Sequence, residues 1–253
     1  MLLRLGRTAK EPPADRQIMT IFAGGRSVPV ILRRSPRARR ISLRLGQKGD
    51  AFVLTLPVRG REGDAIHFAE RHRGWMETRL DRLPAQVAFA AGESIPLRGV
   101  EHRLEARGGL RGLVRVLPES ADGPVISVPG APEHFSRKLT DFLKAEARRD
   151  LTRSAAAYCA AIGVEERRIA LRDPATRWGS CSTSGTISFS WRLIMAPPDV
   201  LDYLAAHEVA HIAHMNHGAG FWRLVRQICP HTDNAERWLK RHGRDLHAYG
   251  PKA

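Results

Sequence analysis

Apolar and polar residues alternate along the first half of the chain, which is the pattern of β-strands that bury one face. Apolar residues recur at every second position over 28–32, 41–45 and 52–56. The turn residues 46–50 therefore predict a β-hairpin between the last two stretches. Residues 1–17 are polar and lack a sustained period, so we expect a flexible leader there. Shorter strands bounded by glycine and proline are expected at 95–97, 102–104, 113–117 and 125–128.

Helical spacing of apolar residues appears first over 64–83, where Asp64 is the expected N-cap and Pro84 follows the last turn. A long helix is expected over 132–163. Further helices are expected in the last quarter of the chain, after Pro198, over 221–228 and from Asp233 onward. Before them, short strands are expected at 169–171 and 186–191, separated by a loop at 173–181.

Together these elements predict an α+β protein, and 253 residues are enough to bury a substantial core. We expect a β-rich N-terminal part with one helix over 18–130. We expect a helix-rich domain with a small β-sheet over 131–253.

One predicted helix carries a motif with metal chemistry. Residues 207–211 read HEVAH, the H-E-x-x-H spacing. Residues four apart lie on one face of a helix, so His207 and His211 can direct two imidazoles at one ion. Glu208 is close enough to act on a bound water as a general base. The alternative is a surface helix with two unrelated histidines.

The third ligand has two candidates. His217 lies ten residues after His207, past the expected end of the helix, so the chain can fold back and offer its imidazole. Three protein ligands leave the fourth tetrahedral position of a catalytic Zn²⁺ for water. His214 would lie a further turn along the helix, aimed beside the ion. We favour His217 and expect His214 to support a ligand or line the cleft.

The net charge of the chain indicates which kinds of binding partner it favours. The chain has 41 Lys+Arg against 26 Asp+Glu, a net charge of +15, which favours an acidic partner or serves solubility alone. Residues 33–40 contain five arginines, which can grip the phosphates of a nucleotide or nucleic acid or can stay solvated. No aromatic residue is interleaved with this basic run to stack on bases.

The cysteines and the apolar stretches of the chain indicate the cellular compartment in which the protein is expected. The three cysteines form no C-x-x-C pair and do not resemble a disulfide framework, so we expect a reducing, cytoplasmic setting. The N-terminus lacks the apolar segment of a secretory signal, and no apolar stretch approaches the ~18 residues of a membrane span.

Four stretches of the chain resemble the YgjP-like metallopeptidase family, and the likeness extends from about residue 25 to 245. They are 37–43 (RARRISL), 176–181 (TRWGSC), 191–197 (WRLIMAP) and 207–222. The resemblance implies a zincin-like catalytic domain over 131–253, with zinc held by His207, His211 and His217 and with Glu208 as base. It also implies a more distant relation to the SprT and Wss metallopeptidases, which act on proteins bound to DNA.

The histidine spacing also equals that of the metzincins. His214 departs from their pattern, because it stands where metzincins have glycine for a turn.

Three functions are therefore open. The first is a peptide-cleaving zinc hydrolase in which the strand 186–191 lies at the cleft edge and pairs with an extended substrate. Arg177 would then face the developing oxyanion or form a structural ion pair. Trp178 would line the cleft or pack in the core. The second is a zinc-dependent nucleoside triphosphate pyrophosphohydrolase, favoured by the arginines. The third is a basic nucleic-acid-associated zinc protein.

Overall fold

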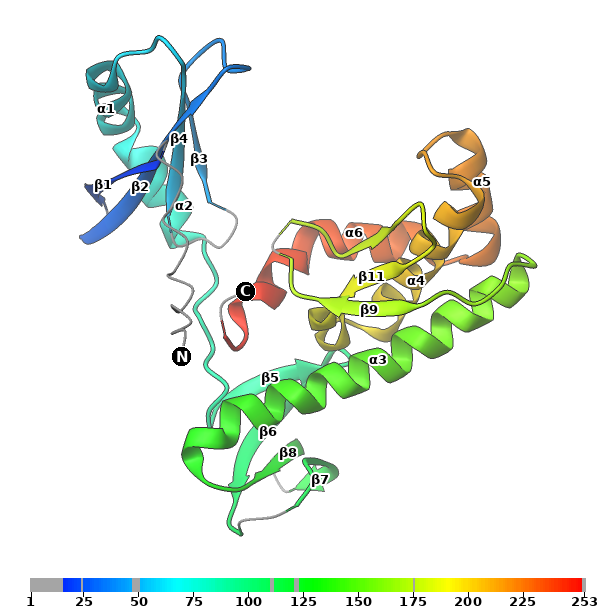
Figure 1. The fold of residues 1–253 in the computed structure, drawn as a ribbon. Helices are drawn as coiled ribbons and strands as arrows, with labels where there is room; N and C mark the ends of the chain where they lie inside the picture. The colour runs from blue at the N-terminus through cyan, green and yellow to red at the C-terminus, as the bar shows by residue number, and fades with distance from the viewer. Residues whose placement is uncertain are drawn as a thin grey trace, which may run out of the picture. The chain divides into compact units, whose positions relative to one another are not determined.

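The computed structural model describes residues 16–23, 25–46, 51–109, 112–120, 123–174 and 176–251 (Figure 1). These residues form helices and three small sheets, so the predicted α+β class is confirmed. They divide into two compact units, one ending at Leu83 and the other beginning at Pro84. Of the predicted leader 1–17, only the last two residues lie within the described part, and they belong to strand β1.

The first unit is a four-stranded sheet in the order β1-β2-β4-β3. Its strands are β1 (Arg16–Ala23), β2 (Arg26–Ser35), β3 (Ser42–Leu45) and β4 (Phe52–Pro57). β3 and β4 pair antiparallel, so the predicted hairpin strands are confirmed, while the turn at 47–50 lies outside the described residues. The alternate residues Val30, Phe52 and Leu54 are fully buried, as the period of two requires.

Two helices complete this core, α1 (Glu62–Arg71) and α2 (Arg73–Asp81). The prediction of one helix over 64–83 capped by Asp64 was wrong. The first helix begins two residues earlier, at Glu62, and a break at His72 separates it from the second. The backbone N–H of His72 donates to the carbonyls of Phe68 and Ala69. The ring of His72 also bonds to the Phe68 carbonyl, at 2.7 Å. The apolar stripe continues across the break, which is why periodicity alone did not reveal it.

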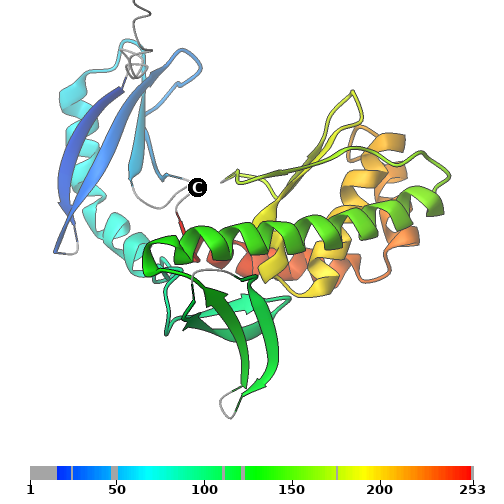
Figure 2. The same cartoon turned by 60° about the horizontal axis from the view of Figure 1, so that its bottom comes forward.

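The second unit begins with another four-stranded sheet, ordered β5-β6-β8-β7. Its strands are β5 (Ser94–Leu97), β6 (Val100–Arg107), β7 (Arg115–Ser120) and β8 (Gly123–Pro129). The long helix α3 (Phe135–Ala161) lies against this sheet (Figure 2). Ile126 of β8 shares a core with Leu139 and Leu143 of α3. This shared core explains why the compact unit starts at Pro84, whereas the sequence predicted a boundary between 130 and 131.

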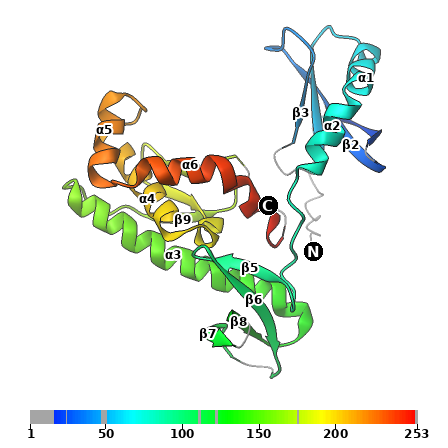
Figure 3. The same cartoon turned by 180° about the vertical axis from the view of Figure 1, so that it is seen from behind.

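A three-stranded sheet and three helices form the rest of the second unit. The sheet has the order β10-β11-β9, with β9 (Ile169–Arg172), β10 (Gly179–Cys181) and β11 (Ile187–Ser190). The helices α4 (Pro198–Ala213), α5 (Ala219–Ile228) and α6 (Thr232–His242) lie close together (Figure 3). The short 3₁₀ helices are η1 (Pro132–His134), η2 (Trp191–Met195) and η3 (Gly243–Ala248). The last predicted helix thus begins one residue before Asp233.

Candidate metal centre

Helix α4 positions the predicted motif. Pro198 occupies its first turn, where a missing N–H costs nothing. Val200, Leu204 and Val209 anchor the helix in the main core, which holds the backbone of the motif rigidly. The helix ends at Ala213, and the next residue, His214, has an extended backbone with a φ of −137°. The positive φ of the metzincin turn is therefore absent at this position, and histidine there is unstrained.

The chain returns after His214 and brings His217 back to the helix. The Nε2 atoms of His207 and His217 lie 3.1 Å apart. One ring nitrogen from each of His207, His211 and His217 lies within 4.8 Å of the other two. Three imidazole nitrogens at this separation surround a point that one tetrahedral ion can occupy. The structure thus brings together all three histidines named from the sequence.

Hydrogen bonds orient two of the rings. Nδ1 of His211 lies 3.0 Å from the backbone carbonyl of His214 and donates to it. Nδ1 of His207 lies 3.4 Å from the hydroxyl oxygen of Tyr203, one turn earlier on α4. The carbonyl acceptor fixes the tautomer of His211 and leaves its Nε2 with a free lone pair, while the hydroxyl of Tyr203 orients the ring of His207. His214 therefore contributes its carbonyl, while its ring is exposed.

The aromatic ring of Phe221, on α5, packs against all three imidazoles of the cluster. Its ring centroid lies 4.5 to 4.9 Å from those of His207, His211 and His217, and the side chain is buried. Burial, together with the charges of the neighbouring His211 and His217, lowers the pKa of His207 to about 4. Burial also lowers the pKa of His211. Both rings are thereby neutral near pH 7, the form that binds a metal ion.

Glu208 is buried beside the cluster, with 4% of its surface exposed. Burial raises the pKa of its carboxyl to about 7, opposed by the charge of Arg177 and by a hydrogen bond from the backbone of Cys181. Oε2 is buried and has no hydrogen-bond partner among the described residues. A buried oxygen without a partner is costly unless a ligand or water completes it. The three imidazoles make a donor set that fits zinc, and they leave the Glu208 carboxylate free to interact with a bound water.

Gly179 of β10 makes the room for this carboxylate. A Cβ atom on Gly179 would lie 2.4 Å from Oε1 of Glu208, closer than real atoms approach. Neither this role of Gly179 nor strand β10 was predicted from the sequence, which indicated a loop over 173–181. The signal was the single glycine within the TRWGSC stretch.

Arg177 and Trp178 line a cavity of about 490 Å³ together with Gly179 and Ser180. The side chain of Arg177 is exposed, and its charge reaches the carboxylate of Glu208. Trp178 is half-buried and stacks on His247, with 4.8 Å between ring centroids. It thus lines the cavity and also packs against η3.

The position of the predicted substrate strand was wrong. β11, expected at the cleft edge, is the central strand of its sheet and pairs on both sides. The edge on the α4 side is β10, whose contacts with α4 hold Gly179 against Glu208. An additional strand can pair only with an edge, so the sheet could accept one at β10 but not at β11.

Arg192 is a buried residue that the sequence analysis did not identify. Its Nε donates to Oδ1 of Asp173 at 2.7 Å, and Nη2 donates to Oδ2 at 3.0 Å. Nη1 donates to the carbonyl of Tyr249 at 2.5 Å. The guanidinium also lies over the ring of Trp191. Because its surface is fully buried, this ion pair fixes the start of the loop that leads to Arg177.

The basic run lies in the first unit. Arg34 donates to the carbonyls of Val58 and Gly60 at 2.8 and 2.7 Å and pairs with Glu62. It therefore has a structural role. The exposed members of the run are Arg33, Arg37, Arg39 and Arg40.

The sequence profile of the YgjP-like metallopeptidase domain matches residues 39–242. The chain belongs to this family. No curated protein matches the chain. Two solved structures are similar to parts of this YgjP-like chain. The metallopeptidase zymogen jannalysin of Methanocaldococcus jannaschii is 18% identical over 36% of this chain and 94% of its own, with a TM-score of 0.33. The zymogen abylysin of Pyrococcus abyssi is 21% identical over 41% of this chain and 98% of its own, with a TM-score of 0.33.

Among the described residues, no helix is long and apolar enough to span a membrane. The cytoplasmic location inferred from the cysteine pattern stays a prediction.

Proposed function

We propose that this metallopeptidase is a zinc enzyme that hydrolyses peptide bonds, with His207, His211 and His217 as ligands and Glu208 as general base. The observation that carries the proposal is the buried Oε2 of Glu208, next to three converging imidazoles, for which the described residues provide no hydrogen-bond partner. A purely structural zinc site has no use for a buried carboxylate next to it. A hydrolytic site needs one to move protons.

When bound, zinc acts as a Lewis acid on the scissile carbonyl and lowers the pKa of a coordinated water to ~7. Glu208 accepts a proton from the attacking water and passes it to the leaving amine. Its pKa of about 7 suits both transfers near neutral pH. Arg177 supplies positive charge for the developing oxyanion. His214 holds His211 through its carbonyl, and Tyr203 holds His207.

An extended peptide suits the surroundings of the carboxylate. Within the part of the chain that the structure describes, β10 pairs only with β11, which leaves its other edge open beside Glu208. Backbone hydrogen bonds along such an edge bind extended chains with little dependence on side chains. The cavity lined by Trp178 and Ser180 lies on the same strand and can accept a substrate side chain. The proposed substrate is therefore an unfolded or extended segment of a peptide or protein.

A comparison of two substrate classes tests the proposal. The purified full chain is incubated with casein-type peptides and, separately, with nucleoside triphosphates. Each is measured with chelator and after zinc is added back. We expect peptide cleavage that chelator abolishes and zinc restores. Hydrolysis of triphosphates alone, or peptide cleavage that chelator leaves unchanged, would contradict it.

A further inference from the structure

A second cluster of metal-ligating side chains lies where α4, α5 and α6 meet (Figure 3). Asp202 comes from α4, Cys229 follows the last residue of α5, and His231 precedes the first residue of α6. One ligand atom from each lies within 4.8 Å of the other two. The cluster shares no residue with the three-histidine site, and the peptidase mechanism does not use it.

The distances within this cluster match those around a bound ion. Nε2 of His231 lies 3.2 Å from Oδ2 of Asp202 and 3.3 Å from Sγ of Cys229. Tetrahedral zinc with bonds of ~2.0–2.3 Å holds its ligands ~3.3–3.6 Å apart. The His207–His217 nitrogen pair, at 3.1 Å, shows a similar separation. Both clusters thus hold their ligand atoms at separations that a small cation can bridge.

Nε2 of His231 faces two groups in this cluster and has only one proton or one lone pair to offer them. A ring nitrogen carries either one proton or one lone pair. If Nε2 of His231 is protonated, it donates to Asp202, and the thiol of Cys229 interacts with the side chains of Tyr158 and Thr232 instead. If Nε2 carries the lone pair, the thiol can donate to it, but the carboxylate oxygen then faces another acceptor. A cation between the three atoms accepts all of their lone pairs at once.

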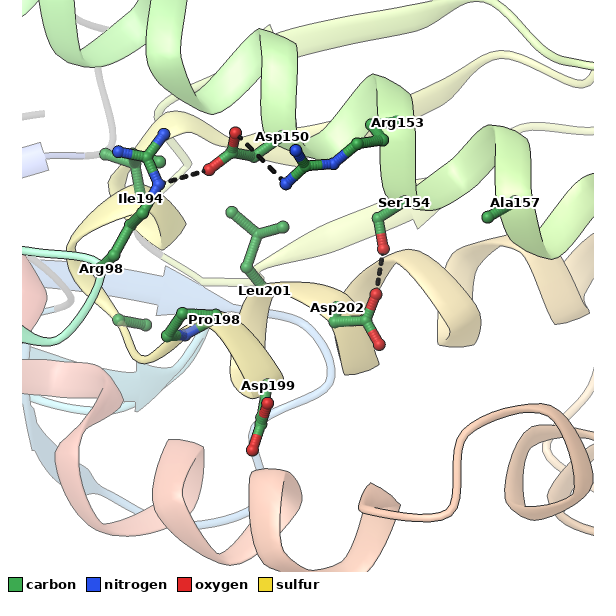
Figure 4. Close-up of a pocket in the computed structure, with 11 residues that line it drawn as sticks. Arg98, Asp150, Arg153, Ser154, Ala157, Ile194, Pro198, Asp199, Leu201 and Asp202 are labelled. Carbon is green, nitrogen blue, oxygen red and sulfur yellow. Dashed lines mark hydrogen bonds and ion pairs between the residues drawn. The ribbon is translucent and has the colours of Figure 1, made fainter.

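Neighbouring residues orient the donors, as they do at metal sites. The hydroxyls of Ser154 and Tyr158, both on α3, donate to the two carboxylate oxygens of Asp202. Figure 4 shows Ser154 directed at Asp202 across the gap between α3 and α4. The hydroxyl of Thr232 donates to the carbonyl of Cys229 at 2.6 Å and holds the Cys-Pro-His turn.

The cluster also has access to solvent. Asp202 and Ser154 line a cavity of about 420 Å³ (Figure 4). The side chains of Asp202 and His231 are 34% and 29% exposed, while Cys229 is buried behind them. An ion can therefore approach from the solvent side, where the carboxylate and imidazole are partly exposed, and can bind the buried thiolate behind them.

We propose that Asp202, Cys229 and His231 form a second metal site that takes a zinc-like divalent cation. Thiolate, imidazole and carboxylate together favour zinc over magnesium or calcium, which prefer oxygen ligands alone. Asp202 lies five residues before His207, ~7.5 Å along α4. The second ion would therefore cross-link the helix of the motif to the junction of α5 and α6. Its role is to stabilise the frame of the active site, and it is independent of the proposed peptidase activity.

Cobalt binding tests the proposal, because a thiolate ligand gives a charge-transfer absorption that imidazoles do not. The metal-free full chain is titrated with Co²⁺, and zinc content is measured in parallel after dialysis. We expect about two ions per chain and a thiolate band. Cys229→Ser should lose the band and bind about one ion. Cys159→Ser is the matched control, since Cys159 is also a buried free cysteine, and it should keep both ions.

His231→Ala provides a second variant at a partly exposed position, in case Cys229→Ser does not fold. It should also lose the band and one ion. His211→Ala removes a ligand of the other cluster and should keep the band, so this proposal and the peptidase proposal can fail separately. A wild-type chain that binds about one ion without a thiolate band would overturn the second site. A band that survives both Cys229→Ser and His231→Ala would also overturn it.

Discussion

Gly179 and Glu208 are packed so closely that no side chain can be added to the glycine: a Cβ atom would lie 2.4 Å from Oε1 of Glu208 and 2.7 Å from its Cγ. Strand β10 therefore forms the wall against which the carboxylate of α4 rests. The φ angle of Gly179 is not in the left-handed region, so the glycine is required for space and not for backbone conformation.

Gly179→Ala is predicted to displace the carboxylate of Glu208 while leaving the histidines in place. A displacement of about 1 Å at a reacting group can cost about 100-fold in rate, so we expect kcat to fall by about that factor with unchanged zinc content. Gly108→Ala is the matched control, because a Cβ there meets nothing within 4 Å. Wild-type kcat in Gly179→Ala would contradict the packing argument.

Paired variants distinguish the ring of His217 from that of His214. His217→Ala removes a proposed ligand and should weaken zinc binding by more than about 100-fold, beyond the usual effect of removing a supporting contact. His214→Ala keeps the backbone carbonyl that accepts from His211 and should bind zinc normally. Competition with a chromophoric chelator measures both affinities. Equal losses in the two variants would show that the assignment of the third ligand is wrong.

Arg177→Gln should lower kcat by about 10- to 100-fold if the charge of Arg177 faces the oxyanion. Loss of one such donor lowers kcat by a factor on the order of 10²–10³ at an enclosed site. We expect a smaller effect here because Arg177 is exposed. KM and zinc content should change little. Steady-state kinetics on a peptide substrate measure the two parameters separately. An effect on KM alone would assign Arg177 to substrate binding.

Acid should destabilise the fold partly through His247, which stacks on Trp178. Burial lowers the pKa of His247, and the charge of Arg192 lowers it further. The unfolded chain, with a histidine pKa of ~6.5, therefore binds a proton that the folded chain rejects. This contribution to stability is present above ~pH 6.5 and is lost as the pH falls through the folded pKa.

His247→Phe should accordingly flatten the loss of unfolding free energy between about pH 7 and pH 5, measured by urea denaturation of the metal-free chain. His134→Phe, at an exposed position, controls for the removal of an imidazole. Identical pH profiles for wild type and His247→Phe would contradict the assignment.

Local pattern predicted the parts of this fold that local physics determines. The period of two located β2 and β4, and the proline with its following apolar stripe located α4. The geometry of a helix then explains why His207 and His211 converge. The return of His217 followed from its distance along the chain.

The features that the sequence did not reveal depend on contacts between distant segments. β10 has three residues and no apolar alternation, so only its partner β11 identifies it as a strand. The division at Leu83 depends on which sheet shares a core with α3. Asp202 and Cys229 are separated by 26 intervening residues, so no motif spacing indicates that they meet.

The central claim is that Glu208 moves the proton of a water activated at the three-histidine site. Glu208→Gln keeps the shape of the side chain but removes its basicity, so zinc content should stay at the wild-type value while kcat for peptide hydrolysis falls by about 10²–10⁴. Measuring both quantities on the same preparation tests the claim most directly. A Glu208→Gln variant that retains zinc and cleaves peptides at the wild-type rate would contradict it.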